Sequence, residues 1–527
     1  MKRTKRKTQK RRERKRRVEE RKRRMRNWQR RIQYRLRERE WENQPKPMFK
    51  ARNIHYEISE RDRGLDVGGI GAIQLLVRRV GLIEKIDEGL DLLKRHLPYH
   101  ESDHVLNIAY NLVAGGTCLE DIEIRRNDEV YLNALGAQRI PDPTTAGDFC
   151  RRFCEEDIEK LMALINEVRL RVWSEQPAEF FEEAVIEADG TLAPTTGECK
   201  EGMDISYKGT WGYHPLLVSL ANTGEPLFLV NRSGNRPSSE GAAERFDQAI
   251  DLCRRAGFRK ITLRGDTDFS LSRYLDGWSE AGVHFVFGFQ AVPILEAWAM
   301  DLDESAWKPL KRRAKYEVKT EPRARPENVK ERIVAERGYK NIKLESEHVA
   351  ELDYQPASCR RSYRMVILRK NLTIERGETE IIDDVRYFFY ITDDRDSSCA
   401  GIVSSANARC NQENLIEQLK NGVRALSMPV DNLVSNWAYM VMASLAWTLK
   451  AWFALALPVK GRWKEKHGEE KRTLLRMEFK KFLLAFIRLP AQLVRTGRRI
   501  VFRLLSWNPY QHVFIRAVEA LERPLIC

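Results

Sequence analysis

The sequence predicts a mixed α/β domain that is interrupted by a β-rich insertion and flanked by two helical regions. Three observations support this fold class. Apolar residues recur at three-to-four spacing from Gly71 to Trp173, runs of strand length begin near Glu179, and helical periodicity returns after residue 430. At 527 residues the chain is long enough for several domains with substantial cores.

Residues 1–45 are expected to form a basic arm. Residues 1–40 hold 22 Lys/Arg and 5 Glu, which leaves 70 basic and 71 acidic side chains in the rest of the chain. Such dense positive charge indicates contact with a polyanion, of which nucleic acid is the first candidate, although a solvated tail for solubility or import is an alternative. We expect the first half of the arm to be disordered in isolation and the second half to be helical. The second half alternates Arg and Glu with Trp28, Ile32, Tyr34 and Leu36.

Residues 46–175 are expected to form a helical DNA-binding domain, after a proline-containing linker over 41–60. The segment Pro141–Phe149 has the composition of a turn followed by a helix N-cap. An all-helical module behind a basic arm suits helix-based docking on DNA, whereas a purely structural helical cap is the alternative.

Residues 176–299 and 386–430 are expected to form the mixed sheet. Helical stretches at 240–256 and 271–281 separate the later strands, and Asn222–Glu225 has the composition of a hairpin turn. The expected order is therefore β-β-β-α-β-α-β. The apolar runs that predict strands are Ala184–Ala188, Leu216–Leu220, Leu227–Val230, Ile261–Leu263 and Val283–Phe289.

Residues 300–385 are rich in charge and contain short alternating runs such as Tyr363–Leu368, which predicts a β-rich insertion. Residues 431–527 are aromatic and are expected to form a C-terminal helical domain. The apolar stretch Val434–Val459 holds Lys450 near its middle, which favours a buried helix over a membrane span. The nine cysteines show no CxxC pair and no histidine at zinc spacing, which fits a reducing cytosol.

Three carboxylates far apart in the sequence stand out as candidate metal ligands. Asp189 and Asp266 each end an apolar strand, and Glu413 lies on a predicted helix. Such carboxylates can converge on divalent ions that cut and join phosphodiester bonds. We expect Gly190 and Gly265, beside the two aspartates, to leave room for a phosphate backbone.

Each carboxylate also has an ordinary explanation. A strand-end aspartate is most often a cap or turn residue, and a helix of mixed charge is usually a solvated face. Glu187 shares the strand face of Asp189, and Asp268 competes with Asp266.

The predicted helix around Glu413 carries charge on one face. At about 100° per residue, Arg409, Glu413 and Lys420 fall on the same side, and Leu415 and Leu419 fall on the opposite side. A metal-binding carboxylate between two cations suits a site that holds both metal ions and DNA phosphates.

The spacing Arg409-x3-Glu413-x6-Lys420 resembles the Tyr-x2-Arg-x3-Glu-x6-Lys signature of DDE transposases of bacterial insertion sequences. Ala406 occupies the tyrosine position, which puts in doubt the DNA contact that the tyrosine makes elsewhere. The resemblance covers about residues 60–520. It also rests on Glu187–Thr191, Gly212–Leu216, Asn231–Asn235, Arg264–Phe269 and the segment around Cys118–Phe149.

The resemblance implies an RNase H-like catalytic core in which Asp189, Asp266 and Glu413 hold two Mg²⁺ ions, with Mn²⁺ as a substitute. Arg409 and Lys420 would neutralise DNA phosphates. It further implies a homodimer on double-stranded DNA that cleaves the terminal inverted repeats and joins them to target DNA by cut-and-paste transposition. We expect a cytoplasmic, nucleoid-associated bacterial protein without a membrane segment.

A short segment before the second predicted strand gives a further expectation. Lys208, Trp211, Tyr213 and His214 would lie near Asp189, where they could grip the transposon end and stack on a flipped base. Ordinary hairpin packing is the alternative. For the whole chain, the competing functions are another RNase H-like nuclease or recombinase, and a non-catalytic nucleic-acid-binding protein.

Overall fold

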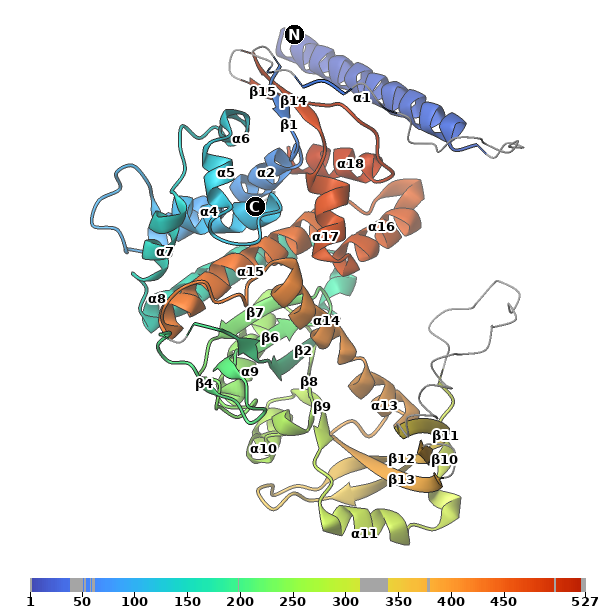
Figure 1. The fold of residues 1–527 in the computed structure, drawn as a ribbon. Helices are drawn as coiled ribbons and strands as arrows, with labels where there is room; N and C mark the ends of the chain where they lie inside the picture. Colours follow the sequence, from blue (N-terminus) through green and yellow to red (C-terminus); the bar gives the residue numbers. More distant parts are fainter. Residues whose placement is uncertain are drawn as a thin grey trace.

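The computed structural model describes residues 2–37, 51, 54–56, 58, 62–197, 199–312, 340–376, 380–496 and 499–522. Most of the predicted linker at 41–60 and part of the predicted insertion lie outside the described residues. The mixed sheet occupies the lower half of Figure 1, and the N-terminal and C-terminal helices lie above it.

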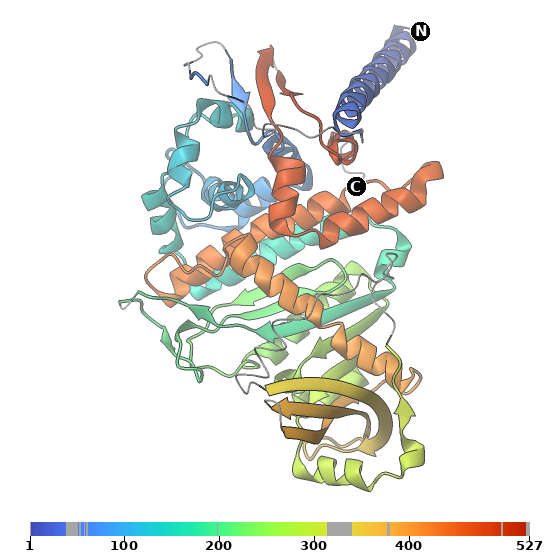
Figure 2. The same cartoon turned by 45° about the vertical axis from the view of Figure 1, so that its right-hand side comes forward.

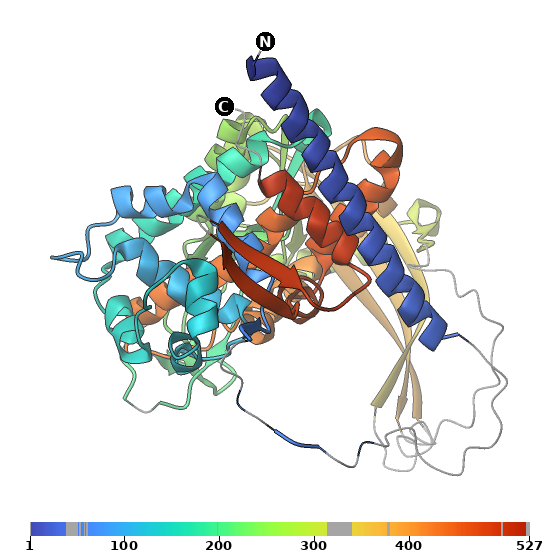
Figure 3. The same cartoon turned by 90° about the horizontal axis from the view of Figure 1, so that it is seen from above.

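The basic arm forms one helix, α1 (Lys2–Arg35). The sequence predicts disorder for the first half of the arm in isolation, but the helix covers both halves. Lys and Arg are good helix formers, and no glycine or proline interrupts residues 1–44. Figure 3 shows α1 passing over α18 (Gln511–Leu521), where the Arg21 guanidinium lies 3.5 Å from the Glu519 carboxylate.

Residues 62–174 are mainly helical, as their periodicity predicts. Asp142 caps one of these helices, because its Oδ1 accepts a hydrogen bond of 2.9 Å from the backbone N–H of Thr145. This cap confirms the turn and N-cap expected at Pro141–Phe149. The elements are β1 (Gly64–Leu65), α2 (Ile70–Val80), α3 (Leu82–Gly89), α4 (Glu101–Val113), α5 (Ile122–Arg126), α6 (Glu129–Leu135), α7 (Pro143–Cys150) and α8 (Glu155–Ser174).

A nine-stranded mixed sheet forms the centre, in the order β10-β11-β12-β13-β9-β8-β2-β6-β7. Strands β2, β6 and β7 are antiparallel neighbours, whereas β8 runs parallel to both β2 and β9. All five strand-length apolar runs lie in strands, and both predicted helices form. These elements are β2 (Glu183–Gly190), β6 (Leu216–Leu220), β7 (Glu225–Val230), α9 (Ala242–Ala256), β8 (Lys260–Gly265), α10 (Ser272–Glu280) and β9 (His284–Phe289).

The strands predicted as an insertion extend this same sheet. β13 pairs antiparallel with β9, so Phe389 lies opposite Phe289, and β12 and β11 follow outward. β13 also crosses the predicted boundary at 385/386. Figure 2 shows the strong curvature of these long strands. The elements are α11 (Pro293–Asp301), β10 (Lys308–Pro309), β11 (Lys340–Tyr354), β12 (Tyr363–Arg376), β13 (Glu380–Thr392) and α13 (Cys399–Asn407).

The C-terminal region is not entirely helical, which corrects the prediction for 431–527. A hairpin of β14 (Ala491–Thr496) and β15 (Arg499–Leu504) pairs with the distant strand β1, with Leu65 opposite Ala491. The hairpin forms because Ala491 and Leu493 are buried against the helices. The remaining elements are α14 (Cys410–Glu417), a π-helical turn (Gln418–Gly422), α15 (Leu433–Leu455), α16 (Lys464–Arg476) and α17 (Phe479–Phe482).

Helix α15 is long and apolar enough to cross a membrane, but its apolar window is fully buried in the protein. It packs between α4, α8 and β7 (Figure 1). Lys450 on this helix donates a hydrogen bond of 2.7 Å to the Leu475 carbonyl, and its ammonium group lies 3.7 Å from the centre of the Trp447 ring. Burial lowers the pKa of Lys450 to about 7.

Candidate active site

The register of two parallel strands brings the two aspartates together. In β2 and β8, Glu183 lies opposite Lys260 and Glu187 lies opposite Arg264. Continuing this register by two residues places Asp189 level with Asp266. Both aspartates therefore lie at the same edge of the sheet, where each strand ends.

A buried glutamine fixes the helix that carries Glu413. Gln412 is 1% exposed, its side-chain N–H donates to the Leu217 carbonyl at 3.3 Å, and its carbonyl oxygen accepts from the Ser219 hydroxyl. These contacts attach α14 to β6, next to the Asp189 strand. Sequence reasoning missed Gln412, although an uncharged polar residue directly before Glu413 was the available signal.

Arg409 lies among all three predicted carboxylates. Its Nη1 is 3.5 Å from the Asp266 Oδ2 and 4.0 Å from the Asp189 Oδ2, and its Nη2 is 3.9 Å from the Glu413 Oε1. One guanidinium therefore links three acids that lie far apart along the chain, between residues 189 and 413. Sequence reasoning assigned Arg409 to DNA phosphates and did not anticipate this position.

Burial and mutual repulsion hold both aspartates toward their neutral forms. Burial, followed by the charge of Asp266, raises the pKa of Asp189 to about 7. Burial is also the largest cause of the raised pKa of Asp266, which Arg409 partly offsets and Asp268 and Glu413 increase. Strongly perturbed carboxyl groups that share a partly exposed edge are typical of functional sites.

Glu187 and Asp268, the two acids that could be mistaken for the predicted ligands, have different surroundings. Glu187 is 1% exposed and forms a close ion pair with Arg264, whose Nη2 is 2.6 Å from its Oε1. Arg264 also donates to the Ser405 carbonyl at 2.9 Å, so the pair fixes α13 against the sheet. Asp268 is exposed, and its backbone N–H donates to Asp266 at 3.1 Å. Neither acid joins the group around Arg409.

The second predicted cation, Lys420, lies in the π-helical turn rather than on a continuous α-helix. The turn changes the helical phase that the sequence predicts. Lys420 nevertheless lies close enough to Asp189 for their charges to interact, although burial lowers its pKa. Leu415 and Leu419 are buried, as the predicted opposite face requires.

The four residues predicted to grip DNA fall into two groups. Lys208 and Trp211 are exposed, with Trp211 at 53%. Trp211 begins β5 (Trp211–Tyr213) of a small sheet with β3 (Ala193–Pro194) and β4 (Asp204–Ile205), and Lys208 lies in the turn between β4 and β5. His214 is buried, and its Nδ1 lies 2.7 Å from the Arg236 carbonyl. Tyr213 is fully buried and donates to the Glu201 carbonyl at 2.8 Å, so the structure does not support a DNA contact for it.

The two glycines beside the aspartates are needed for packing, which corrects the expectation that they leave room for DNA. A Cβ at Gly265 would lie 2.6 Å from the Phe269 Cβ. A Cβ at Gly190 would lie 3.0 Å from the His214 Nε2 and 3.1 Å from Ser238. Protein atoms therefore already fill both positions.

The donor set of the three carboxylates fits divalent cations that prefer hard oxygen ligands. Burial, followed by the charge of Asp266, raises the pKa of Asp189, so the ionised form of this carboxyl group is disfavoured. A cation bound there would relieve this repulsion. Among the described residues, however, these carboxylates do not form a group with all ligand atoms within 4.8 Å of one another. They would have to move closer to share one ion.

Comparisons with known proteins identify the family of the chain. Residues 63–525 match the family described as "Transposase DDE domain group 1". A solved piggyBac transposase synaptic complex with hairpin DNA is similar to the chain at 9% identity and a TM-score of 0.35, over 80% of this chain and 82% of that chain. No curated protein matches. Because the family match spans most of its length, the chain belongs to the DDE transposase family.

Proposed function

We propose that this transposase cleaves the ends of its transposon and joins the freed 3′-hydroxyl to target DNA, with Asp189, Asp266 and Glu413 as its catalytic acids. The observation that carries the proposal is the convergence of these three acids on Arg409. The strand order β7-β6-β2-β8-β9, with one aspartate at the end of β2 and the other directly after β8, supports an RNase H-like core.

The three carboxylates would hold two Mg²⁺ ions, with Mn²⁺ as a substitute. When bound, such ions activate the attacking oxygen and stabilise the leaving oxygen of a phosphodiester. The chain's own contribution is to hold the carboxylates at one sheet edge and to present cations beside them. Arg409 and Lys420 would neutralise DNA phosphates near the cut, and their proximity to Asp266 and Asp189 supports this role.

The proposal extends to the DNA and to the assembly. Lys208 and Trp211 are exposed and remain candidates for contact with the transposon end. The helices at 62–174 and the basic helix α1 would add DNA contacts, the latter independent of sequence. We propose a homodimer on the terminal inverted repeats, cut-and-paste movement, and action in the bacterial cytoplasm at the nucleoid.

Strand cleavage and strand transfer on labelled transposon ends test the proposal. Asp189→Asn, Asp266→Asn and Glu413→Gln should each lower both rates at least about 1,000-fold, because each removes a charged metal ligand. Binding of the uncut DNA should persist. Asp268→Asn, next to Asp266 but outside the group around Arg409, is the matched control and should retain activity.

Two outcomes would change the conclusion. Normal cleavage by any of the three variants would remove that residue from the catalytic set. Metal-dependent cleavage by the wild-type protein, without joining of a labelled 3′-hydroxyl end to a plasmid, would favour a nuclease or recombinase over a transposase.

A further inference from the structure

A group of side chains with the chemistry of metal ligands lies in the helical region, outside the carboxylate site. His96 and His100 belong to the segment between α3 and α4, and Glu101 is the first residue of α4. One ligand atom from each lies within 4.8 Å of the other two, and no other described group of His, Cys, Asp and Glu meets this criterion. We propose that these three side chains bind a divalent transition-metal ion of the zinc class.

The buried carboxylate of Glu101 is the strongest support for this site. Its side chain is 0% exposed, and its Oε1 accepts hydrogen bonds from the backbone N–H groups of Leu92 and Leu93 at 3.1 and 3.0 Å. Its Oε2 is also buried but accepts no hydrogen bond from any described residue. A buried carboxylate oxygen without a donor is costly, and a bound cation would satisfy it.

The position of His96 relative to Glu101 fits two ligands of one metal ion better than it fits a hydrogen bond. Its Nε2 lies 3.0 Å from the Glu101 Oε2, yet the two atoms are not aligned as donor and acceptor. Ligands of one zinc ion at about 2.0–2.2 Å lie roughly 3.3 Å apart at tetrahedral angles. This close, unaligned pair is therefore near the spacing that a common metal ion requires.

His100 completes the set after a small adjustment. Its ring stacks on the ring of His96, with centroids 4.5 Å apart and planes inclined by 19°. Metal ions bind imidazole nitrogens in the plane of the ring, so the two rings must turn toward a common point. Both histidines are exposed, so their rings are not enclosed by the protein.

The donor types select the metal class and separate this site from the catalytic one. Two imidazole nitrogens and one carboxylate oxygen suit Zn²⁺ and related transition ions, whereas Mg²⁺ prefers oxygen ligands alone. Helix α4 lies across α15 from the sheet strand β7 (Figure 1), so the ion would not serve the carboxylate site.

A bound ion would fix the segment between α3 and α4 to the start of α4. This segment borders a cavity of about 620 Å³ whose lining includes Lys94, Arg95 and Arg152. The ion would thereby hold two basic residues of the segment in place on the helical region.

Metal titration of the full chain tests the site. The Asp189→Asn protein serves as the parent, so that the carboxylate site competes less for the ion. Competition of Zn²⁺ against a chromophoric chelator should give one tight site, and millimolar Mg²⁺ should not displace the ion. His96→Gln, His100→Gln and Glu101→Gln should each weaken Zn²⁺ binding at least about tenfold, since loss of an outer-sphere partner alone costs that much.

The variants of the metal titration should fold, and a matched control is available. Glu101→Gln retains the Oε1 acceptor for Leu92 and Leu93, and His96 is 45% exposed, so both variants should fold. The matched control is His512→Gln, which removes a histidine that lies 3.0 Å from Glu470 and is hydrogen-bonded to it. Its Zn²⁺ affinity should equal that of the parent.

Co²⁺ substitution supplies a second readout. The proposal predicts visible d–d bands without the near-ultraviolet charge-transfer absorption of thiolate ligands. Parent-like Zn²⁺ affinity in all three variants, or a thiolate signature in the Co²⁺ spectrum, would overturn it, the latter by assigning the ion to cysteines.

Discussion

Two buried groups of charged residues in this protein differ in how completely their charges are balanced. At the interface of α8, β7 and α15, Glu225 is 0% exposed and accepts from Arg169 at 3.1 Å, Trp173 at 3.0 Å and Trp452 at 2.8 Å. At the sheet edge, three carboxylates share Arg409 at distances of 3.5 to 4.0 Å. The first group is closed by hydrogen bonds, and the second carries surplus negative charge.

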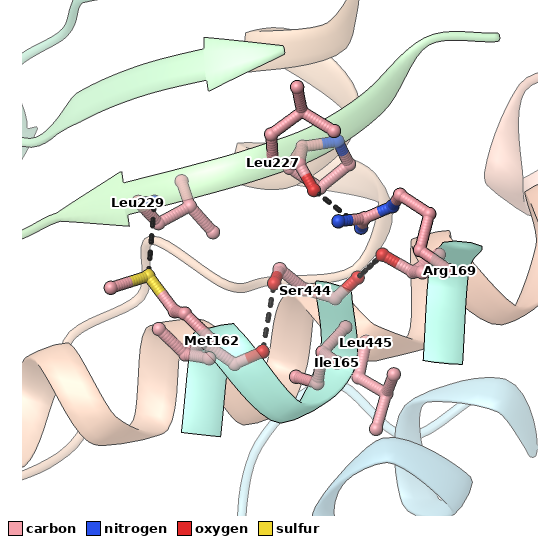
Figure 4. Close-up of a pocket in the computed structure, with 10 residues that line it drawn as sticks. Met162, Ile165, Arg169, Leu227, Leu229, Ser444 and Leu445 are labelled. Carbon is pink, nitrogen blue, oxygen red and sulfur yellow. Dashed lines mark hydrogen bonds between the residues drawn. The ribbon is translucent and has the colours of Figure 1, made fainter. Parts of the chain in front are cut away.

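The surroundings of the two groups match their charge balance. Arg169 also donates to the Pro226 carbonyl at 2.8 Å and to the Asn166 side chain, so each of its three side-chain nitrogens donates a hydrogen bond. Only a cavity of about 20 Å³ lies beside it, lined by residues such as Met162, Leu227 and Ser444 (Figure 4). No substrate fits in such a space. A buried ion pair whose charges are balanced serves the fold, whereas a group of acids with too few cations can bind one.

The largest expected effect on stability comes from breaking the ion pair of Glu225 and Arg169. Glu225→Gln leaves the Arg169 guanidinium buried without its counter-charge, which should lower the free energy of unfolding by about 3–5 kcal/mol. Denaturant titration at neutral pH measures it. The control, Glu240→Gln, removes an exposed partner of Arg236 and should cost less than about 0.5 kcal/mol. Equal effects of the two variants would contradict the comparison.

The same kind of substitution at the sheet edge should act in the opposite direction. The pKa of Asp189 is raised by folding, so its charged form opposes folding. This penalty is absent below about pH 4, the ordinary range of an aspartate, and grows as the pH rises to about 7. At pH 8 and without divalent ions, Asp189→Asn should therefore raise the free energy of unfolding, on the order of 2 kcal/mol.

Unfolding curves at several pH values check this prediction. The stability difference between Asp189→Asn and wild type should open between pH 4 and 7 and stay constant above pH 7. Asp251→Asn, which changes an exposed aspartate outside this group of acids, is the control and should follow wild type at every pH. A destabilised Asp189→Asn protein at pH 8 would mean that the carboxylate is satisfied after all.

A third substitution measures one hydrogen bond in the closed group. Trp452→Phe removes an indole N–H that donates to the Glu225 carboxylate, and should cost about 1–2 kcal/mol beyond the loss of ring volume. Trp437→Phe is the matched control on the same helix, because that indole donates to the neutral Leu229 carbonyl. Denaturant midpoints of both variants should therefore differ, with Trp452→Phe the less stable.

The sequence predicts the parts of the fold that depend on local pattern. Short apolar runs bounded by turn residues become strands, as Leu216–Leu220 does, because strand length and burial are encoded within a few residues. The pairing of β1 with β14 could not be predicted, since Leu65 and Ala491 meet only in the folded chain and β1 has just two residues. The joining of β13 to β9 depends in the same way on a distant partner.

The candidate site can likewise be predicted only where it depends on residues that are close in sequence. The spacing of Arg409, Glu413 and Lys420 identifies a charged helix from the sequence alone. The central place of Arg409 depends on strand register and on the anchoring of Gln412, both of which arise from tertiary contacts. Tyr213 was assigned to DNA because an aromatic residue near Asp189 suggests stacking, whereas its burial depends on the distant Glu201 carbonyl.

The smallest expected effect concerns Arg409, which offsets part of the charge that a metal ion would offset further. Arg409→Gln removes this cation, so in the absence of divalent ions the variant should be less stable than wild type by about 1 kcal/mol at pH 8, a modest value because the side chain is 28% exposed. The difference should shrink as the pH falls below about 7, because Asp189 then gains its proton. Added Mg²⁺ should then raise the thermal midpoint of the variant more than that of wild type, because the guanidinium no longer competes for the same oxygens.

Arg236→Gln, at an exposed pair remote from the three acids in sequence, should show the wild-type response to Mg²⁺. An identical Mg²⁺ response in Arg409→Gln and wild type would show that the arginine and the ion do not share ligands, and the contrast between closed and open charge groups would then lose its link to metal binding.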